Sequence, residues 1–227
     1  MVPWAVVLGS KDVWAVTISY FCYGYVAWIF FSWFYIYLAE VRGLNLKTSA
    51  FYAMLPFLAM AAACPVGGIV NDRFTKLYGR RLGRCGIAAV SILTAAIFIA
   101  TGSQVGSARV ASVVLAGGAG ALYLSQSSFW SVTADIGGTS SGSVCGFMNM
   151  GAQLGGAMTA SLTPAIAEHF GWIASFLVAA ALCVVGAAAW LFVNPETSLA
   201  LREHPAHTDA IHDSLTTRDS QQAFWTK

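Results

Sequence analysis

Polar and aromatic side chains recur at helical spacing inside otherwise apolar stretches of the chain. Asn149 and Gln153 lie four residues apart, and Ser127 and Trp130 lie three apart, so each pair shares one face of a helix. Aromatic rings provide flat apolar walls, while hydroxyls and amides make hydrogen bonds. This chemistry suits a small hydroxylated or carboxylated molecule. The residues predicted to line its binding site are Tyr20, Tyr23, Tyr123, Ser127, Trp130, Asn149 and Gln153.

Each of these groups also has a purely structural interpretation. An amide inside an apolar helix is costly without a partner, so Asn149 and Gln153 either face a cavity or hydrogen-bond across helices. Trp130 also fits an aromatic belt at a membrane surface. The opposite face of the same stretch carries Gly151 and Gly155, a small-residue pair that allows close approach of another helix.

Other kinds of site are not indicated. No nucleophile–base pair, phosphate-binding glycine loop or metal-ligand spacing occurs, so we expect neither an enzyme nor a cofactor nor a metal. The histidines His204, His207 and His212 are better explained as a solvated tail than as a metal tract. Positive charge gathers in one segment and not on an aromatic-studded surface, so nucleic acid is not an expected partner.

The elements that position these residues are predicted to be membrane helices. The chain is 57% hydrophobic and 10% charged, whereas soluble domains carry about 25% charge. Six apolar stretches are long enough to span a bilayer, and none has an ionisable residue at mid-depth. They do not alternate as barrel strands do. The expected spans are about 13–38, 49–70, 86–102, 109–132, 142–167 and 172–193.

A basic segment between the second and third spans predicts the orientation. If this segment is cytoplasmic, nine Lys and Arg fall on the cytoplasmic side and three on the other, which satisfies the positive-inside rule. Both termini are then cytoplasmic, in a multi-pass protein of a bacterial inner membrane. Residues 1–198 form the membrane domain, and 199–227 are too polar to fold alone, which predicts a disordered cytoplasmic tail.

The basic segment resembles the loop pattern G-x-x-x-D-R-x-G-R-R of major facilitator transporters. The matching residues, predicted to act in gating, are Gly68, Asp72, Arg73, Gly79, Arg80 and Arg81. Further matching segments are 28–38, 55–57, Phe129–Trp130, Ala134–Asp135, 143–156 and 170–176. The chain is similar to helices seven to twelve of the anion:cation symporter family, which includes hexuronate, glucarate and galactonate carriers and the sialin type.

The resemblance implies a fold and an activity. It implies an all-α integral membrane fold in which six helices form one half, a 3+3 inverted repeat, of a major facilitator transporter. The implied activity is transport of small organic anions such as sugar acids by alternating access, coupled to protons. Three departures are the insert 74–78, Tyr35 in place of a family proline, and Ile173 in place of a family arginine.

The resemblance covers only one half of such a transporter. The family's coupling residues and its substrate-pairing arginine lie mainly in the other half, so we expect a missing six-helix half or a partner chain, besides the lipid bilayer and a small organic anion. The alternatives are a truncated, inactive fragment and a non-transporting six-helix scaffold or regulator.

Overall fold

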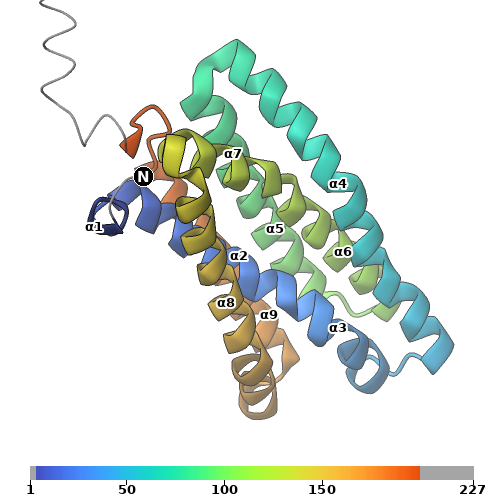
Figure 1. The fold of residues 1–227 in the computed structure, drawn as a ribbon. Helices are drawn as coiled ribbons and strands as arrows, with labels where there is room; N and C mark the ends of the chain where they lie inside the picture. The colour runs from blue at the N-terminus through green and yellow to red at the C-terminus, as the bar shows by residue number, and fades with distance from the viewer. Residues whose placement is uncertain (1–3, 200–227) are drawn as a thin grey trace, which may run out of the picture.

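The computed structural model describes residues 4–199, and every regular element in that range is a helix (Figure 1). The predicted all-α class is therefore confirmed. Most of the predicted tail lies outside the described residues. The α-helices are α1 Trp4–Leu8, α2 Lys11–Ser32, α3 Phe34–Ile36, α4 Leu46–Arg80, α5 Ile87–Gln104, α6 Ala108–Leu124, α7 Gln126–Gly137, α8 Ser141–Phe170 and α9 Trp172–Ala189. Shorter turns are η1 Tyr37–Val41, η2 Arg81–Gly86, η3 Gly138–Ser140 and η4 Trp190–Phe192.

Helix α2 packs closely against α8 because both helices carry small residues at the contact. A Cβ on Gly24 would lie 2.3 Å from the carbonyl oxygen of Ala152, and one on Gly155 would lie 2.2 Å from that of Phe21. Backbone therefore meets backbone along this seam, as in small-residue membrane helix pairs. The Tyr25 and Thr163 hydroxyls, 3.0 Å apart, continue the contact toward the far end of α8.

Helix α4 packs against α6 and α7 in the same manner. A Cβ on Gly67 would lie 2.2 Å from the carbonyl oxygen of Leu124, and one on Gly120 would lie 3.2 Å from the Cβ of Ala59. The helix is continuous from Leu46 to the kink at Gly79, which is about 50 Å at 1.5 Å per residue, whereas the bilayer core is about 30 Å thick. A helix of this length that crossed a bilayer upright would extend beyond the lipid hydrocarbon at one end.

The chain reverses direction between α4 and α5 (Figure 1). Gly79 has φ 82° and ψ 170°, a conformation that glycine adopts at little cost. The π-helical turn η2 follows, and a Cβ on its Gly83 would lie 2.4 Å from the Thr75 backbone. The turn is tight because Gly79 allows the chain to bend and Gly83 allows it to pack against the backbone of α4.

Four helical stretches in the described range are long and apolar enough to cross a membrane, judged by length and composition. They are Lys11–Ser32, Leu46–Gln104, Ala108–Phe170 and Trp172–Phe192. The second and third have 59 and 63 residues and include the reversals at η2 and η3. Large apolar side chains such as Leu58, Ile69 and Val90 lie on the outer surface, as expected where lipid replaces water.

Candidate substrate-binding and gating sites

An aromatic cluster joins α2, α6 and α7. The rings of Tyr20 and Tyr23 stack with centroids 5.1 Å apart, and Tyr23 lies 5.6 Å from Tyr123. Trp130 meets Tyr20 edge-on at 6.4 Å. Tyr20 and Tyr23 are 4% and 5% exposed, whereas Trp130 is 42% exposed. The tyrosines of α2 therefore form a buried wall, and the indole of Trp130 lies at its open edge.

A break between α6 and α7 positions the polar part of this cluster. The Ser125 N–H and Oγ both donate to the Leu122 carbonyl, at 3.1 and 2.6 Å, which is the tight i to i−3 pattern of a 3₁₀ turn. The next residue, Gln126, donates from Nε2 to the Tyr20 hydroxyl at 3.1 Å. Gln126 was not among the residues predicted to line the site, so its contact with Tyr20 was not predicted.

Three consecutive residues after this break each have a buried polar atom with no hydrogen-bond partner among the residues described. They are Gln126 Oε1, Ser127 Oγ and Ser128 Oγ. Ser127 lies against α4. A Cβ added to Gly68 of α4 would be 4.0 Å from the Cβ of Ser127. Buried polar groups usually have partners, so a group without one is a candidate ligand contact.

The amides of α8 lie on the open side of the helix. Asn149 is half-buried, and Gln153 is exposed. Neither makes a hydrogen bond with any other residue in 4–199 that the structure records. Gly151 and Gly155, on the other face, are buried against α2. The division predicted for α8, with amides on one side and close packing on the other, agrees with this arrangement.

Trp130 and Asn149 lie at similar depth along the bundle. Helices α7 and α8 run in opposite directions from the turn η3 (Figure 1), and Thr133 Oγ1 and Cys145 Sγ are 3.1 Å apart between them. Trp130 precedes Thr133 by three residues and Asn149 follows Cys145 by four. Both therefore lie about one helical turn, or about 5 Å, beyond that contact. The indole and the amide thus project from neighbouring helices at the same level.

The predicted gating residues lie at the end of the bundle that contains η2. The segment expected to be a loop is instead helical as far as Gly79, where the backbone leaves helical geometry, and Gly68, Asp72 and Arg73 lie on α4. Asp72 is exposed and makes no ion pair within residues 4–199. Asp72 therefore has no arginine partner in the described part of the chain.

The ion pair at this end joins two other residues. Arg84 of η2 pairs with Asp135 of α7, and both side chains are largely buried, with 19% and 15% exposed. Arg84 also donates to the Ser131 carbonyl at 2.9 Å, and Asn71 Nδ2 donates to the Ser131 hydroxyl at 3.4 Å. These contacts tie η2 and α4 to α7. The position of Asp135 just beyond the predicted span 109–132 could have marked it as a candidate for an ion pair. Nothing in the sequence indicated which residue would be its partner.

Comparison with known proteins assigns the family. The model of the family described as Major Facilitator Superfamily matches residues 1–160 and 137–225. The chain belongs to the major facilitator superfamily. Superfamily members are multi-pass membrane proteins, so the apolar surface of the helices faces lipid. Among residues 4–199 no group of His, Cys, Asp and Glu side chains has the arrangement of a metal site.

Several curated superfamily relatives are similar to this chain. The probable sulfoacetate transporter of Cupriavidus necator is 33% identical over 82% of the chain and 44% of that protein. The chloroplastic ascorbate transporter of Arabidopsis thaliana is 30% identical over 88% of the chain and 37% of the relative. The hexuronate transporter of Bacillus subtilis is 28% identical, covering 86% and 47%. The chain therefore spans less than half the length of these relatives.

Proposed function

We propose that this chain supplies the C-terminal half of a symporter for small organic anions such as sugar acids. The names of the relatives, which include sulfoacetate, ascorbate and hexuronate transporters, support an organic anion as substrate. Transport proceeds by alternating access and is coupled to protons. The half that completes the transporter is a second set of six helices, on the same polypeptide or on a partner.

The proposed membrane topology has six spans in a 3+3 inverted repeat. It is supported by the reversals at η2 and η3, which divide each of the two longest helical stretches into two segments. The basic residues Arg73, Lys76, Arg80, Arg81 and Arg84 lie around the first reversal. Cationic loops are retained in the cytoplasm, so this end and both termini are proposed to face the cytoplasm of a bacterial cell.

The observation that carries the proposed binding site is that Trp130 and Asn149 lie at similar depth on two neighbouring helices, α7 and α8. These two side chains project at one level, with buried tyrosines behind the indole and the exposed Gln153 one turn further along α8. An aromatic wall beside amides binds a sugar acid through its ring face and its hydroxyls. The unpartnered Gln126 Oε1 and Ser127 Oγ add an acceptor and a hydroxyl.

The proposed site lacks a counter-charge for the substrate carboxylate. The residues assigned to it are tyrosines, a serine, a tryptophan and two amides, all uncharged. An anion leaving water needs a cationic or strongly donating partner. In this proposal the cation comes from the other half, so this half recognises hydroxyls and the other half recognises the acid group.

The proposed gate is the ion pair Arg84–Asp135 together with the basic residues around it. Because Arg84 lies in the turn between α4 and α5 and Asp135 lies near the end of α7, the pair holds three helices together at one end of the bundle. Breaking and remaking such contacts accompanies rocking of one half against the other. Asp72, Arg73, Arg80 and Arg81 are exposed and are available to contact the other half.

The binding site is tested with Asn149→Ala in the full-length protein that contains this chain. Loss of one or two hydrogen bonds to a substrate hydroxyl should weaken binding about tenfold. The matched control is Gln104→Ala, because Gln104 is an exposed amide that bonds only within its own helix, to the Ala100 carbonyl at 2.9 Å. Binding of glucuronate, galactonate and sulfoacetate to purified protein is the measurement. If the Asn149→Ala variant binds all three anions normally, Asn149 does not contact the substrate and the proposed binding site is wrong.

A further inference from the structure

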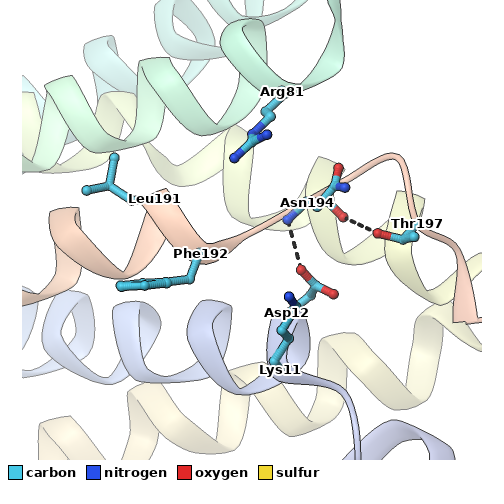
Figure 2. Close-up of a pocket in the computed structure, with 7 residues that line it drawn as sticks. All are labelled: Lys11, Asp12, Arg81, Leu191, Phe192, Asn194 and Thr197. Atoms are coloured by element: carbon cyan, nitrogen blue, oxygen red, sulfur yellow. Dashed lines mark hydrogen bonds between the residues drawn. The ribbon is translucent and has the colours of Figure 1, made fainter.

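A polar cavity of about 420 Å³ lies where the start of α2, the turn η2 and the segment after η4 meet (Figure 2). Arg81 approaches it from one side, and Lys11 and Asp12 approach from the opposite side. Asn194 and Thr197 close the cavity along the chain that leaves η4. The cavity lies apart from the aromatic cluster and from the Arg84–Asp135 pair, and it shares with the proposed gate only the exposed Arg81.

The charges around the cavity favour an anion. The Asp12 carboxylate is 1% exposed and accepts a hydrogen bond from the Asn194 backbone N–H at 2.9 Å, drawn as a dashed line in Figure 2. Lys11 and Arg81 are exposed, and neither makes an ion pair within residues 4–199. Two cations therefore border a space whose single carboxylate already accepts a backbone hydrogen bond.

An apolar groove continues from this cavity along the outside of the bundle. It has a volume of about 680 Å³ and runs between α2 and α9, lined by Trp14, Ile18, Val185 and Phe192. Lys11 and Phe192 border both the cavity and the groove, so the two are continuous. Its lining is almost entirely carbon, and in a bilayer such a surface faces acyl chains.

A second groove lies on the other side of α9. It has a volume of about 270 Å³ and is lined by residues of α5 and α9, among them Val90 and Leu93. Leu191 borders both this groove and the polar cavity. Ala188 borders both grooves. The polar cavity therefore adjoins two apolar grooves, one on each side of α9.

We propose that this surface binds one anionic phospholipid. Its headgroup phosphate lies between Lys11 and Arg81, and its two acyl chains follow the grooves on either side of α9. A phosphate diester carries a full negative charge, which suits two cations at a membrane boundary that make no ion pair within residues 4–199. A soluble phosphate would use the cavity but would leave the grooves without a role. The proposal depends on insertion in a bilayer and not on transport.

The headgroup part is tested with charge-removing variants of the full chain, purified in detergent and depleted of lipid. Retention of phosphatidylglycerol is compared with that of phosphatidylcholine of the same acyl composition by native mass spectrometry. Lys11→Gln and Arg81→Gln should each weaken phosphatidylglycerol retention about fivefold, because a basic residue near an anionic headgroup contributes about that factor. Lys76→Gln removes an exposed cation at the same end of the bundle but away from the cavity, and should change retention less than twofold.

The acyl-chain part is tested on α9. Ala188→Trp fills the channels and should weaken retention about tenfold, because about two methylenes lose their contacts. Ala181→Trp is the matched control, since Ala181 is also exposed on α9, lies two turns earlier on the same face, and borders neither groove. Because the variants change different elements, a folding failure in one leaves the others interpretable.

Several results would overturn the proposal. One is equal retention of phosphatidylglycerol and phosphatidylcholine, and another is equal loss in Arg81→Gln and Lys76→Gln. A third is displacement of the lipid by inorganic phosphate together with normal retention in Ala188→Trp, which would assign the cavity to a free anion. The proposal is supported if the protein retains phosphatidylglycerol better than phosphatidylcholine, and if this retention falls in Lys11→Gln, Arg81→Gln and Ala188→Trp but not in the two control variants.

Discussion

Replacing Gly155 by alanine tests the backbone contact between α2 and α8. The added Cβ would lie 2.2 Å from the Phe21 carbonyl oxygen and 2.9 Å from the Tyr25 nitrogen, whereas ordinary contact begins at 3.4 Å. The two helices must therefore separate by about 1 Å. Overpacking of this kind costs about 1–3 kcal/mol, and the better helix propensity of alanine returns about 0.5–1 kcal/mol.

The net effect expected for Gly155→Ala is a loss of up to about 2.5 kcal/mol, or a fall of up to about 10 °C in melting temperature. Reaction of a maleimide dye with the cysteines is a suitable assay, because Cys22, Cys85 and Cys183 are buried and become reactive only on unfolding. Gly146→Ala on the same helix is the control. Nothing lies within 4 Å of a Cβ there, so its melting temperature should stay the same or rise slightly.

Gly156→Ala provides an internal check on the same reasoning. Its added Cβ would lie 2.3 Å from Trp28 Cδ1, which is a side-chain atom and not backbone. Trp28→Ala should therefore restore stability to Gly156→Ala, whereas no side-chain replacement relieves Gly155→Ala. Equal melting temperatures for Gly155→Ala and Gly146→Ala would show that the α2–α8 seam is looser than the distances indicate.

Three further predictions concern the proposed gate and coupling. Asp135→Asn should lower stability by about 1–3 kcal/mol, because it leaves the largely buried Arg84 guanidinium without a counter-charge; Asp135→Glu should recover part of this loss in the same dye assay. In the full-length transporter Asp72→Asn should slow transport while equilibrium substrate binding changes less than about threefold, and loss of binding with a normal transport cycle would contradict a gating role. Reconstituted residues 1–227 alone should not accumulate glucuronate under an inward proton gradient, because no expected span holds an ionisable residue at mid-depth; accumulation that an uncoupler abolishes would refute this.

Local sequence patterns were sufficient to predict the helical class and the two faces of α8. Gly151 and Gly155 recur at a spacing that only a helix brings onto one side, and the structure places both against α2. The amides Asn149 and Gln153 fall on the open side for the same reason. Helical periodicity is a property of neighbouring residues, so a single sequence contains it.

Features that depend on distant residues were not predictable in this way. Arg84 and Asp135 are 51 residues apart, and no local pattern indicates that two such side chains meet. The break at Ser125 is set by hydrogen bonds to the Leu122 carbonyl, and an isolated serine in an apolar stretch gives little sign of it. The length of α4 was also missed, because charged residues end a membrane span without ending a helix.

The backbone contact between α2 and α8 fixes the dimensions of the proposed binding face. With Gly24 and Gly155 seated against carbonyl oxygens of the other helix, neither helix slides along the other without a steric clash. If the chain functions as proposed, the distance from the tyrosine rings of α2 to the amides of α8 should therefore stay constant through a transport cycle. The proposed site would then select substrates partly by length, because a molecule too short to reach from ring to amide gains only one of the two contacts.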